Sequence, residues 1–294
     1  MLFRTDLALE LKEDSSENTE GTEFTTENIS DFKITRIKIK TKKASEEIGK
    51  PIGNYVTLEI PDFSNDAKNI KAKSFVVSEE IKKMLPKNGS ILIIGLGNSS
   101  ITPDSLGPET TKIILATRHI KKQIENNLGS NDLRSVSVLA PGVLGQTGIE
   151  IVEILKGLTK KIEPSCVILI DALASKQTSR LGKTIQISNT GISPGSGVGN
   201  SRPLIDEKTI GVPIVSIGIP MVVDVQTLIV DLMNYSNENE LEKLKSKINP
   251  RGMSMMVTPK DIDILIKRAA KLTGTAINLA LHEGLNVEDF LSSK

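Results

Sequence analysis

Two aspartates that each follow a short apolar run are the residues of this sequence best suited to chemistry. Residues 91–94 lead into a glycine-containing turn and then to Asp104, and residues 166–170 run directly into Asp171. Short β-branched runs are typical of buried strands, and the carboxyl ends of such strands form the ligand-binding edge of an α/β sheet. The sequence therefore predicts that the two carboxylates share one catalytic site.

Paired carboxylates suit the hydrolysis of a bond by water. Two neighbouring negative charges push their pKa values apart, so that one group acts as a base while the other keeps its proton. Taken alone, either Asp104 or Asp171 could instead cap a helix or form a turn. No competing nucleophile is indicated, because the sequence has one cysteine, inside an apolar run, and two histidines.

A glycine-rich segment at residues 191–200 is the second candidate for the site. The backbone amides around Gly191, Gly195, Gly197 and Gly199 could hold a substrate or stabilise an oxyanion. Their spacing matches neither the dinucleotide-binding nor the phosphate-loop pattern. We therefore favour a substrate loop over phosphate binding, with a purely structural loop as the remaining alternative.

Alternating strand and helix patterns predict the α/β fold that must position these residues. The predicted strands lie at 32–40, 55–60, 91–94, 136–139, 166–170, 184–187 and 213–217, and the predicted helices at 64–85, 108–125, 148–158 and from 258 onward. Some connections are too short for helical crossovers, so the sheet should be mixed. We expect a single three-layer domain at residues 31–294, preceded by a polar, mobile segment at 7–30.

Composition narrows the function classes. The formal net charge is +1, only 3% of the 294 residues are aromatic, and tryptophan is absent, so nothing favours a direct nucleic-acid partner. No cysteine or histidine cluster has metal-binding spacing, and we expect neither a metal nor a cofactor. No apolar run approaches a bilayer-spanning length, so we expect no membrane partner and a cytoplasmic location.

One hexad pattern occurs twice near the N-terminus. Residues 5–10 and 22–27 both read threonine, acid, large apolar residue, two further residues and glutamate. In an acidic, threonine-rich region this is explained by chance or by turn and cap formation.

Several longer segments together resemble the spore germination protease family. They are residues 4–8, 95–108, 117–119, 140–150, 171–174, 184–200, 218–224 and 256–260, which are spread over nearly the whole chain. The resemblance implies a phosphorylase/hydrolase-like fold similar to that of hydrogenase-maturation proteases. It also implies an endopeptidase of the spore core that degrades small acid-soluble, DNA-binding spore proteins during germination. The resemblance further implies that the two aspartates implicated in catalysis in this family correspond to Asp104 and Asp171.

The family is described as homotetrameric and as made in an inactive precursor form. By this resemblance, self-cleavage between Asp6 and Leu7 would release residues 1–6 as a propeptide, which is short for the family. A second cut after Glu23 is a weaker hypothesis, because Thr25 stands where alanine is expected. Two further positions depart from the family pattern: Asn189 stands where the family usually has aspartate, and Ser193 stands where it usually has histidine. The chain is also shorter than many relatives between residues 235 and 253.

Two other readings remain open on the sequence alone. A hydrogenase-maturation-type protease, which senses a metal on its substrate, has a similar strand, Gly-x-Gly-Asn and acid arrangement. A nucleotide-binding or peptidyl-tRNA hydrolase-like protein is suggested by residues 95–98 and 117–119, although the lack of a basic surplus weighs against RNA.

Overall fold

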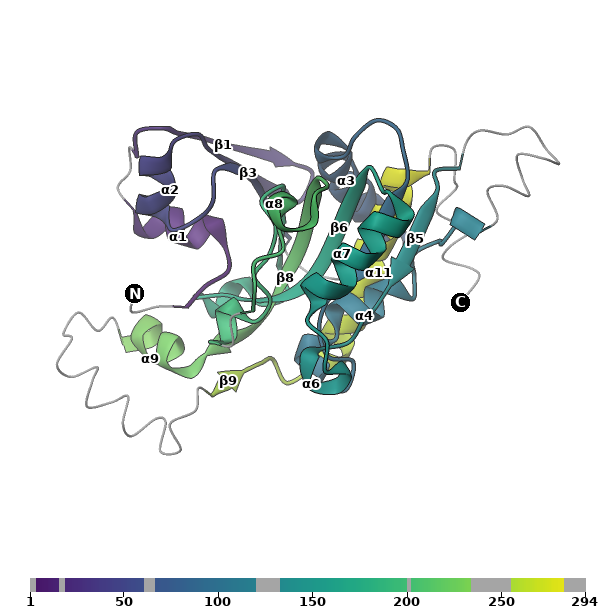
Figure 1. The fold of residues 1–294 in the computed structure, drawn as a ribbon. Helices are drawn as coiled ribbons and strands as arrows, with labels where there is room; N and C mark the ends of the chain where they lie inside the picture. The colour runs from purple at the N-terminus through teal and green to yellow at the C-terminus, as the bar shows by residue number, and fades with distance from the viewer. Residues whose placement is uncertain are drawn as a thin grey trace.

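A mixed β-sheet forms the centre of the fold (Figure 1). The computed structural model describes residues 4–15, 19–60, 67–119, 133–199, 202–233 and 255–282. Within them, eight strands lie side by side in the order β1-β2-β3-β7-β8-β6-β4-β5, and β9 pairs with β8. Their bounds are β1 Thr22–Ile29, β2 Phe32–Ile39, β3 Gly53–Glu59, β4 Ile91–Gly95, β5 Val136–Leu139, β6 Cys166–Ala174, β7 Thr184–Ser188, β8 Ile214–Asp224 and β9 Met256–Val257.

The sheet has a parallel half and an antiparallel half, as the short connections predicted. Strands β5, β4, β6 and β8 run parallel to one another, whereas β7, β3, β2 and β1 are each antiparallel to their neighbours. Every residue of β4 is buried, as expected for a parallel strand that is covered on both faces. The carboxyl ends of β4 and β6 lie next to each other and form the edge that carries the site.

Helices cover both faces of the sheet, which confirms the predicted α/β architecture. Alternate residues of β4 face opposite sides: Ile91 and Ile93 pack into the core beneath α3 and α11, and Leu92 and Ile94 into the core beneath α7 and α8. The helix bounds are α1 Ala8–Asp14, α2 Lys42–Ile48, α3 Ala67–Met84, α4 Leu106–Thr111, α6 Leu144–Thr147, α7 Ile151–Ile162, α8 Glu207–Ile210, α9 Val225–Met233 and α11 Ile262–Leu281.

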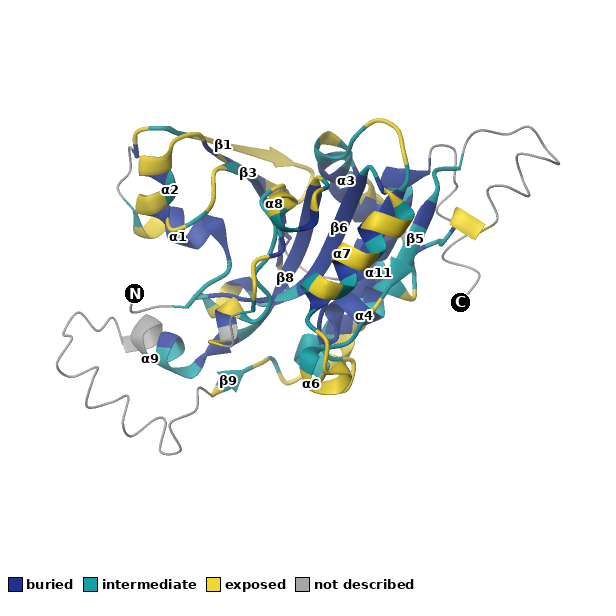
Figure 2. Ribbon diagram, in the orientation of Figure 1, coloured by how far each residue is buried: buried dark blue, intermediate teal, exposed yellow. Residues whose placement is uncertain are grey.

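The prediction of a mobile segment at residues 7–30 is wrong for the part of it that is described. Ala8 and Leu9, at the start of α1, are buried in a cluster with Ile37 and other residues of β2, β3 and α2, and Leu7 just before the helix is buried too. Strand β1 pairs with β2 along its whole length, but its side chains face solvent (Figure 2). An edge strand whose side chains face solvent needs no apolar face. This explains why apolar and polar residues do not alternate in this part of the sequence.

Several element ends also differ from the predictions. Strand β6 continues three residues past Asp171, and α4 ends at Thr111 rather than near residue 125. Helix α11 begins at Ile262 rather than at residue 258, and the Thr258 hydroxyl donates to the Met221 carbonyl. Residues 235–253 lie outside the described residues. No described helix has both the length and the apolar character that crossing a membrane requires.

Candidate active site

A cavity of about 260 Å³ lies at the sheet edge and brings most of the predicted site residues together. Asp104 and Asp171 both line it, with Gly191, Gly195 and Gly197 on the opposite loop. Asp6, the residue before the predicted self-cleavage site, also lines it. Gly199 is not among the lining residues, and a side-chain carbon there would meet the guanidinium of Arg4 instead.

Asp104 is held by the tight turn that follows β4. It ends the short 3-10 helix η1, Thr102–Asp104, and its Oδ2 accepts a hydrogen bond of 2.7 Å from the Asn98 amide. Gly97 has φ 111°, and a side-chain carbon there would come within 2.0 Å of the Asp104 carbonyl oxygen. Burial raises the pKa of Asp104, and the Asn98 N–H opposes this increase.

The sequence indicated that Asp171 follows the end of a strand, but in the structure Asp171 lies inside β6. Its neighbour in the register of β8 is Gly218, and it is 5% exposed. Burial, followed by the negative charges of Asp104 and Asp6, raises the pKa of Asp171 well above its ordinary value, although the Ala172 N–H donates to Oδ1 at 2.9 Å. Asp171 is therefore the member of the pair best suited to hold a proton.

The buried carboxyl of Asp171 should reduce stability in a pH-dependent way. Because its pKa is raised in the folded state, folding favours the protonated form, and this stability is lost as pH rises through the folded-state pKa. We expect Asp171→Asn to raise the free energy of unfolding at neutral pH by about 1–2 kcal/mol. The gain should vanish below about pH 4, where the carboxyl is protonated in both states. Urea unfolding of the parent and the variant at neutral pH and below pH 4 measures this gain. An equal gain at both pH values would contradict the prediction.

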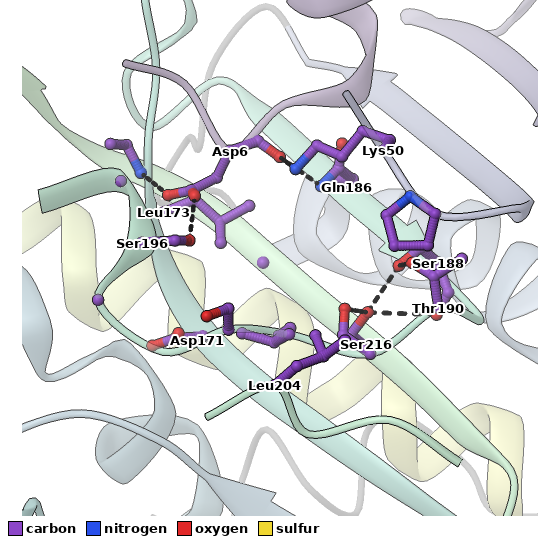
Figure 3. Close-up of a pocket in the computed structure, with 18 of the residues that line it drawn as sticks. Asp6, Lys50, Asp171, Leu173, Gln186, Ser188, Thr190, Ser196, Leu204 and Ser216 are labelled. Carbon is purple, nitrogen blue, oxygen red and sulfur yellow. Dashed lines mark hydrogen bonds between the residues drawn. The ribbon is translucent and has the colours of Figure 1, made fainter. Parts of the chain in front are cut away.

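The chain's own N-terminal segment passes beside the cavity, and Asp6 forms part of its wall (Figure 3). The Asp6 amide donates to the Ala174 carbonyl, and the Ala174 amide donates to Asp6 Oδ2, both at 2.9 Å. The Ser196 hydroxyl donates to Asp6 Oδ1 at 2.8 Å. The end of β6 and the glycine-rich loop thus bind the acidic side chain that precedes the predicted cleavage site.

Two side chains that the sequence analysis missed contact the Asp6 carbonyl oxygen. Lys50 Nζ donates to it at 2.9 Å and Gln186 Nε2 at 3.1 Å (Figure 3). Burial lowers the pKa of Lys50, and the negative charge of Asp6 opposes this shift. Neither residue belongs to a motif with recognisable spacing, so nothing in the sequence singled them out.

The residues after Asp6 are also bound. Leu7 and Ala8 are fully buried. The Glu10 carboxylate accepts hydrogen bonds from the amides of Lys176, at 2.6 Å, and Gln177, at 3.0 Å, and lies 3.3 Å from Arg180. The hydroxyl of Thr5 donates to the same carboxylate. The acid, the apolar residue, the alanine and the glutamate of the first hexad therefore each have a defined place in the structure.

The second hexad has a different environment. Residues 22–27 form most of β1, where they pair with β2. Glu23, the residue before the weaker predicted cut, forms an exposed ion pair with Lys40.

Gly197 fits the acidic side chain closely. A side-chain carbon at this position would lie 2.1 Å from Asp6 Oδ2 and 2.6 Å from the Cβ of Ala174. The Ser196 hydroxyl of this loop donates to the Asp6 carboxylate, whereas the donors to the Asp6 carbonyl are Lys50 and Gln186, so the oxyanion role of the loop glycines stays a prediction.

We expect Gly197→Ala to slow the predicted cleavage after Asp6 by at least about tenfold, because the added methyl displaces the acid and its charged hydrogen bonds. Intact mass spectrometry over time would measure the rate. Gly157→Ala on α7 is the matched control, since a methyl there meets no atom within 4 Å. Equal rates in the two variants would contradict this account.

Comparison with known proteins identifies the family. The family model described as germination protease matches residues 4–243. The chain belongs to the germination protease family. It is 41% identical to the germination protease of Caldanaerobacter subterraneus subsp. tengcongensis, over 98% of this chain and 96% of that one. The germination protease of Clostridium tetani is 40% identical, with 99% of each chain covered.

Family membership establishes a protease of spore germination and supersedes the peptidyl-tRNA hydrolase and hydrogenase-maturation readings of the sequence. Among solved structures, the chain is similar to the [NiFe] hydrogenase maturation protease HycI from Thermococcus kodakarensis KOD1, at 14% identity and a TM-score of 0.34. That match covers 67% of this chain and 98% of the other. Within the described residues, no group of three or more histidine, cysteine, aspartate or glutamate side chains could hold a metal ion.

Proposed function

We propose that this germination protease is made as a precursor that cuts its own Asp6–Leu7 bond and then degrades small acid-soluble spore proteins. The observation that carries the proposal is the position of Asp6 in the wall of the cavity. The predicted scissile residue Asp6 lines the same cavity as Asp104 and Asp171, and it is bound through its amide, carboxylate and carbonyl.

The proposed chemistry is direct attack of water on the Asp6 carbonyl carbon. Asp104, which is less buried, takes a proton from the water, and Asp171 gives its proton to the leaving nitrogen of Leu7. A second negative charge is hard to form beside the first, so the two carboxylates share one proton. One of them is then ionised and acts as the base, while the other is protonated and acts as the acid. The Asp6–Leu7 bond breaks, leaving a carboxyl group on Asp6 and a new α-amine on Leu7.

The contacts of Glu10 support a substrate class. A spore protein that carries threonine, acid, apolar residue, alanine and a glutamate in this order would take over the contacts that residues 5–10 make. Its glutamate would take the amides of Lys176 and Gln177 and the charge of Arg180. We further propose a homotetramer in the cytoplasm of the spore core, with no direct nucleic-acid or membrane partner.

The test uses two reactions. The precursor, made by cell-free translation, is followed by intact mass spectrometry, and we expect loss of residues 1–6 at a rate that does not depend on protein concentration. The processed protein is then mixed with a small acid-soluble spore protein, and the cuts are located by mass. Cuts after the acid of the hexad pattern would support the proposal. An intact spore protein beside a processed enzyme would overturn its substrate, and a precursor that never changes mass would overturn self-processing.

A further inference from the structure

The carbonyl oxygen of Asp6 gains a full negative charge in the proposed reaction, so groups that donate hydrogen bonds to it should increase the rate. When water attacks a peptide carbonyl, the carbon becomes tetrahedral and the oxygen becomes an oxyanion. The two side-chain donors to this oxygen are Lys50 Nζ and Gln186 Nε2. Both come from outside the Asp104–Asp171 pair and outside the glycine-rich loop.

The orientation of the Gln186 amide is fixed by the chain it binds. Its Oε1 accepts a hydrogen bond of 2.6 Å from the Ala8 amide. An N–H can only donate, so the oxygen of the Gln186 amide must face Ala8 and its NH2 group must face the Asp6 carbonyl. Gln186 therefore spans the Asp6–Leu7 bond, with one atom on each side of it. The side chain is 8% exposed and comes from β7, which pairs with β3 and β8.

Lys50 is anchored at the end of α2. Gly49 closes that helix in the left-handed conformation, and the Ser45 hydroxyl donates to the Lys50 carbonyl at 2.7 Å. The ammonium group reaches the Asp6 carbonyl from this fixed backbone. A cation beside a developing oxyanion in a poorly hydrated site stabilises it far more than in water.

We propose that Lys50 and Gln186 are catalytic residues that stabilise the oxyanion formed on the carbonyl of the cleaved bond. The assignment rests on the proposed self-cleavage after Asp6. In the step they assist, the water oxygen bonds to the carbonyl carbon and the π electrons move onto the carbonyl oxygen. Lys50 and Gln186 donate hydrogen bonds to that oxygen and lose no proton, and the C=O bond re-forms when the bond to the Leu7 nitrogen breaks. The loop around Gly197 then selects the acidic side chain.

The first test compares the first-order rate of self-processing among full-length precursors. We expect Lys50→Met, which keeps the length of the side chain and removes its donor, to lower the rate by about 10²–10³-fold. Gln186→Glu retains an acceptor for Ala8 and removes the donor, so it should be slowed to a similar degree. Lys43→Met is the control, because Lys43 lies on the surface beside Glu20, and its rate should match the parent.

A rescue experiment separates catalysis from folding. Unprocessed Lys50→Cys protein is purified and treated with 2-bromoethylamine, which builds a lysine-like side chain with a terminal amine on the introduced thiol; the native Cys166 is buried. We expect cleavage at Asp6–Leu7 to begin on treatment. Hydrogen exchange at the Ala8 amide of the untreated Lys50→Cys protein should be as slow as in unprocessed Lys50→Met protein, which would show that the segment is docked before the amine is added.

The outcomes distinguish this inference from the proposed function. Parent-like processing of Lys50→Met, or no rescue of folded Lys50→Cys protein by the added amine, would overturn the role of Lys50 while self-cleavage stands. Parent-like processing of Gln186→Glu would do the same for Gln186. A parent chain that is never cut at Asp6–Leu7 would overturn both proposals.

Discussion

Asp104→Asn and Asp171→Asn should each abolish self-processing on the timescale over which the parent chain is fully cut. Asparagine keeps the size of the side chain, and its oxygen can still accept from Asn98 or Ala172. It can neither take a proton from water nor release one to the leaving nitrogen. Loss of a general acid or base costs about 10²–10⁴-fold in rate. The double variant should be no slower than the slower single variant, because the two groups act as a unit.

The measurement is the intact mass of each precursor over time, with urea unfolding as the check on folding. Asp263→Asn, on the exposed start of α11, is the matched control and should process like the parent. Processing that survives in both Asp104→Asn and Asp171→Asn would exclude the aspartate pair as the source of the activated water. Loss in only one of them would leave a single catalytic carboxylate.

The aspartate pair was predictable because it follows from sheet geometry. The carboxyl ends of adjacent parallel strands share an edge, and β4 and β6 are adjacent. The exact place of Asp171 was not predicted, because an acidic residue after an apolar run usually marks the end of a strand, whereas β6 continues through Ala174. A buried carboxylate within a strand violates the usual pattern, and such violations are expected at functional sites.

The pattern of the sequence could not reveal Lys50 and Gln186. Gln186 occupies an ordinary position in a strand whose neighbours are apolar, and Lys50 follows a helix in a region rich in lysine. Their importance depends on long-range packing that brings α2 and β7 to the same carbonyl group. No local spacing encodes such a meeting.

The N-terminal segment was misjudged for a related reason. Its polar composition predicts a mobile chain, yet Leu7, Ala8 and Leu9 are buried and the polar groups of Asp6 and Glu10 are bound. A segment that is recognised as a substrate needs a pocket for each side chain rather than an amphipathic period. Under the proposed function, the contacts of Asp6 and Glu10 would also be those that a spore protein with the hexad pattern makes.

The rate of self-processing should have a bell-shaped dependence on pH that is displaced upward from the ordinary carboxyl range. Cleavage needs one aspartate ionised and the other protonated. Burial raises the pKa of Asp104, and burial with the charges of Asp104 and Asp6 raises the pKa of Asp171 well above its ordinary value. Below the first apparent pKa of the pair both groups are protonated and no base remains. Above the second, both are ionised and no acid remains.

Each limb of the profile should approach a tenfold loss of rate per pH unit, because each reports the loss of one proton-transfer group. We would measure the first-order rate in buffers of constant ionic strength, with urea unfolding at each pH to exclude denaturation. Asp171→Asn is the control for the alkaline limb. Its residual rate depends on Asp104 as the base alone, so this rate should fall at low pH and show no decrease at high pH. A rate that keeps rising through the alkaline range in the parent would show that no carboxylic acid protonates the leaving nitrogen. Asp171 would then act through its negative charge, and the leaving nitrogen would take its proton from another donor.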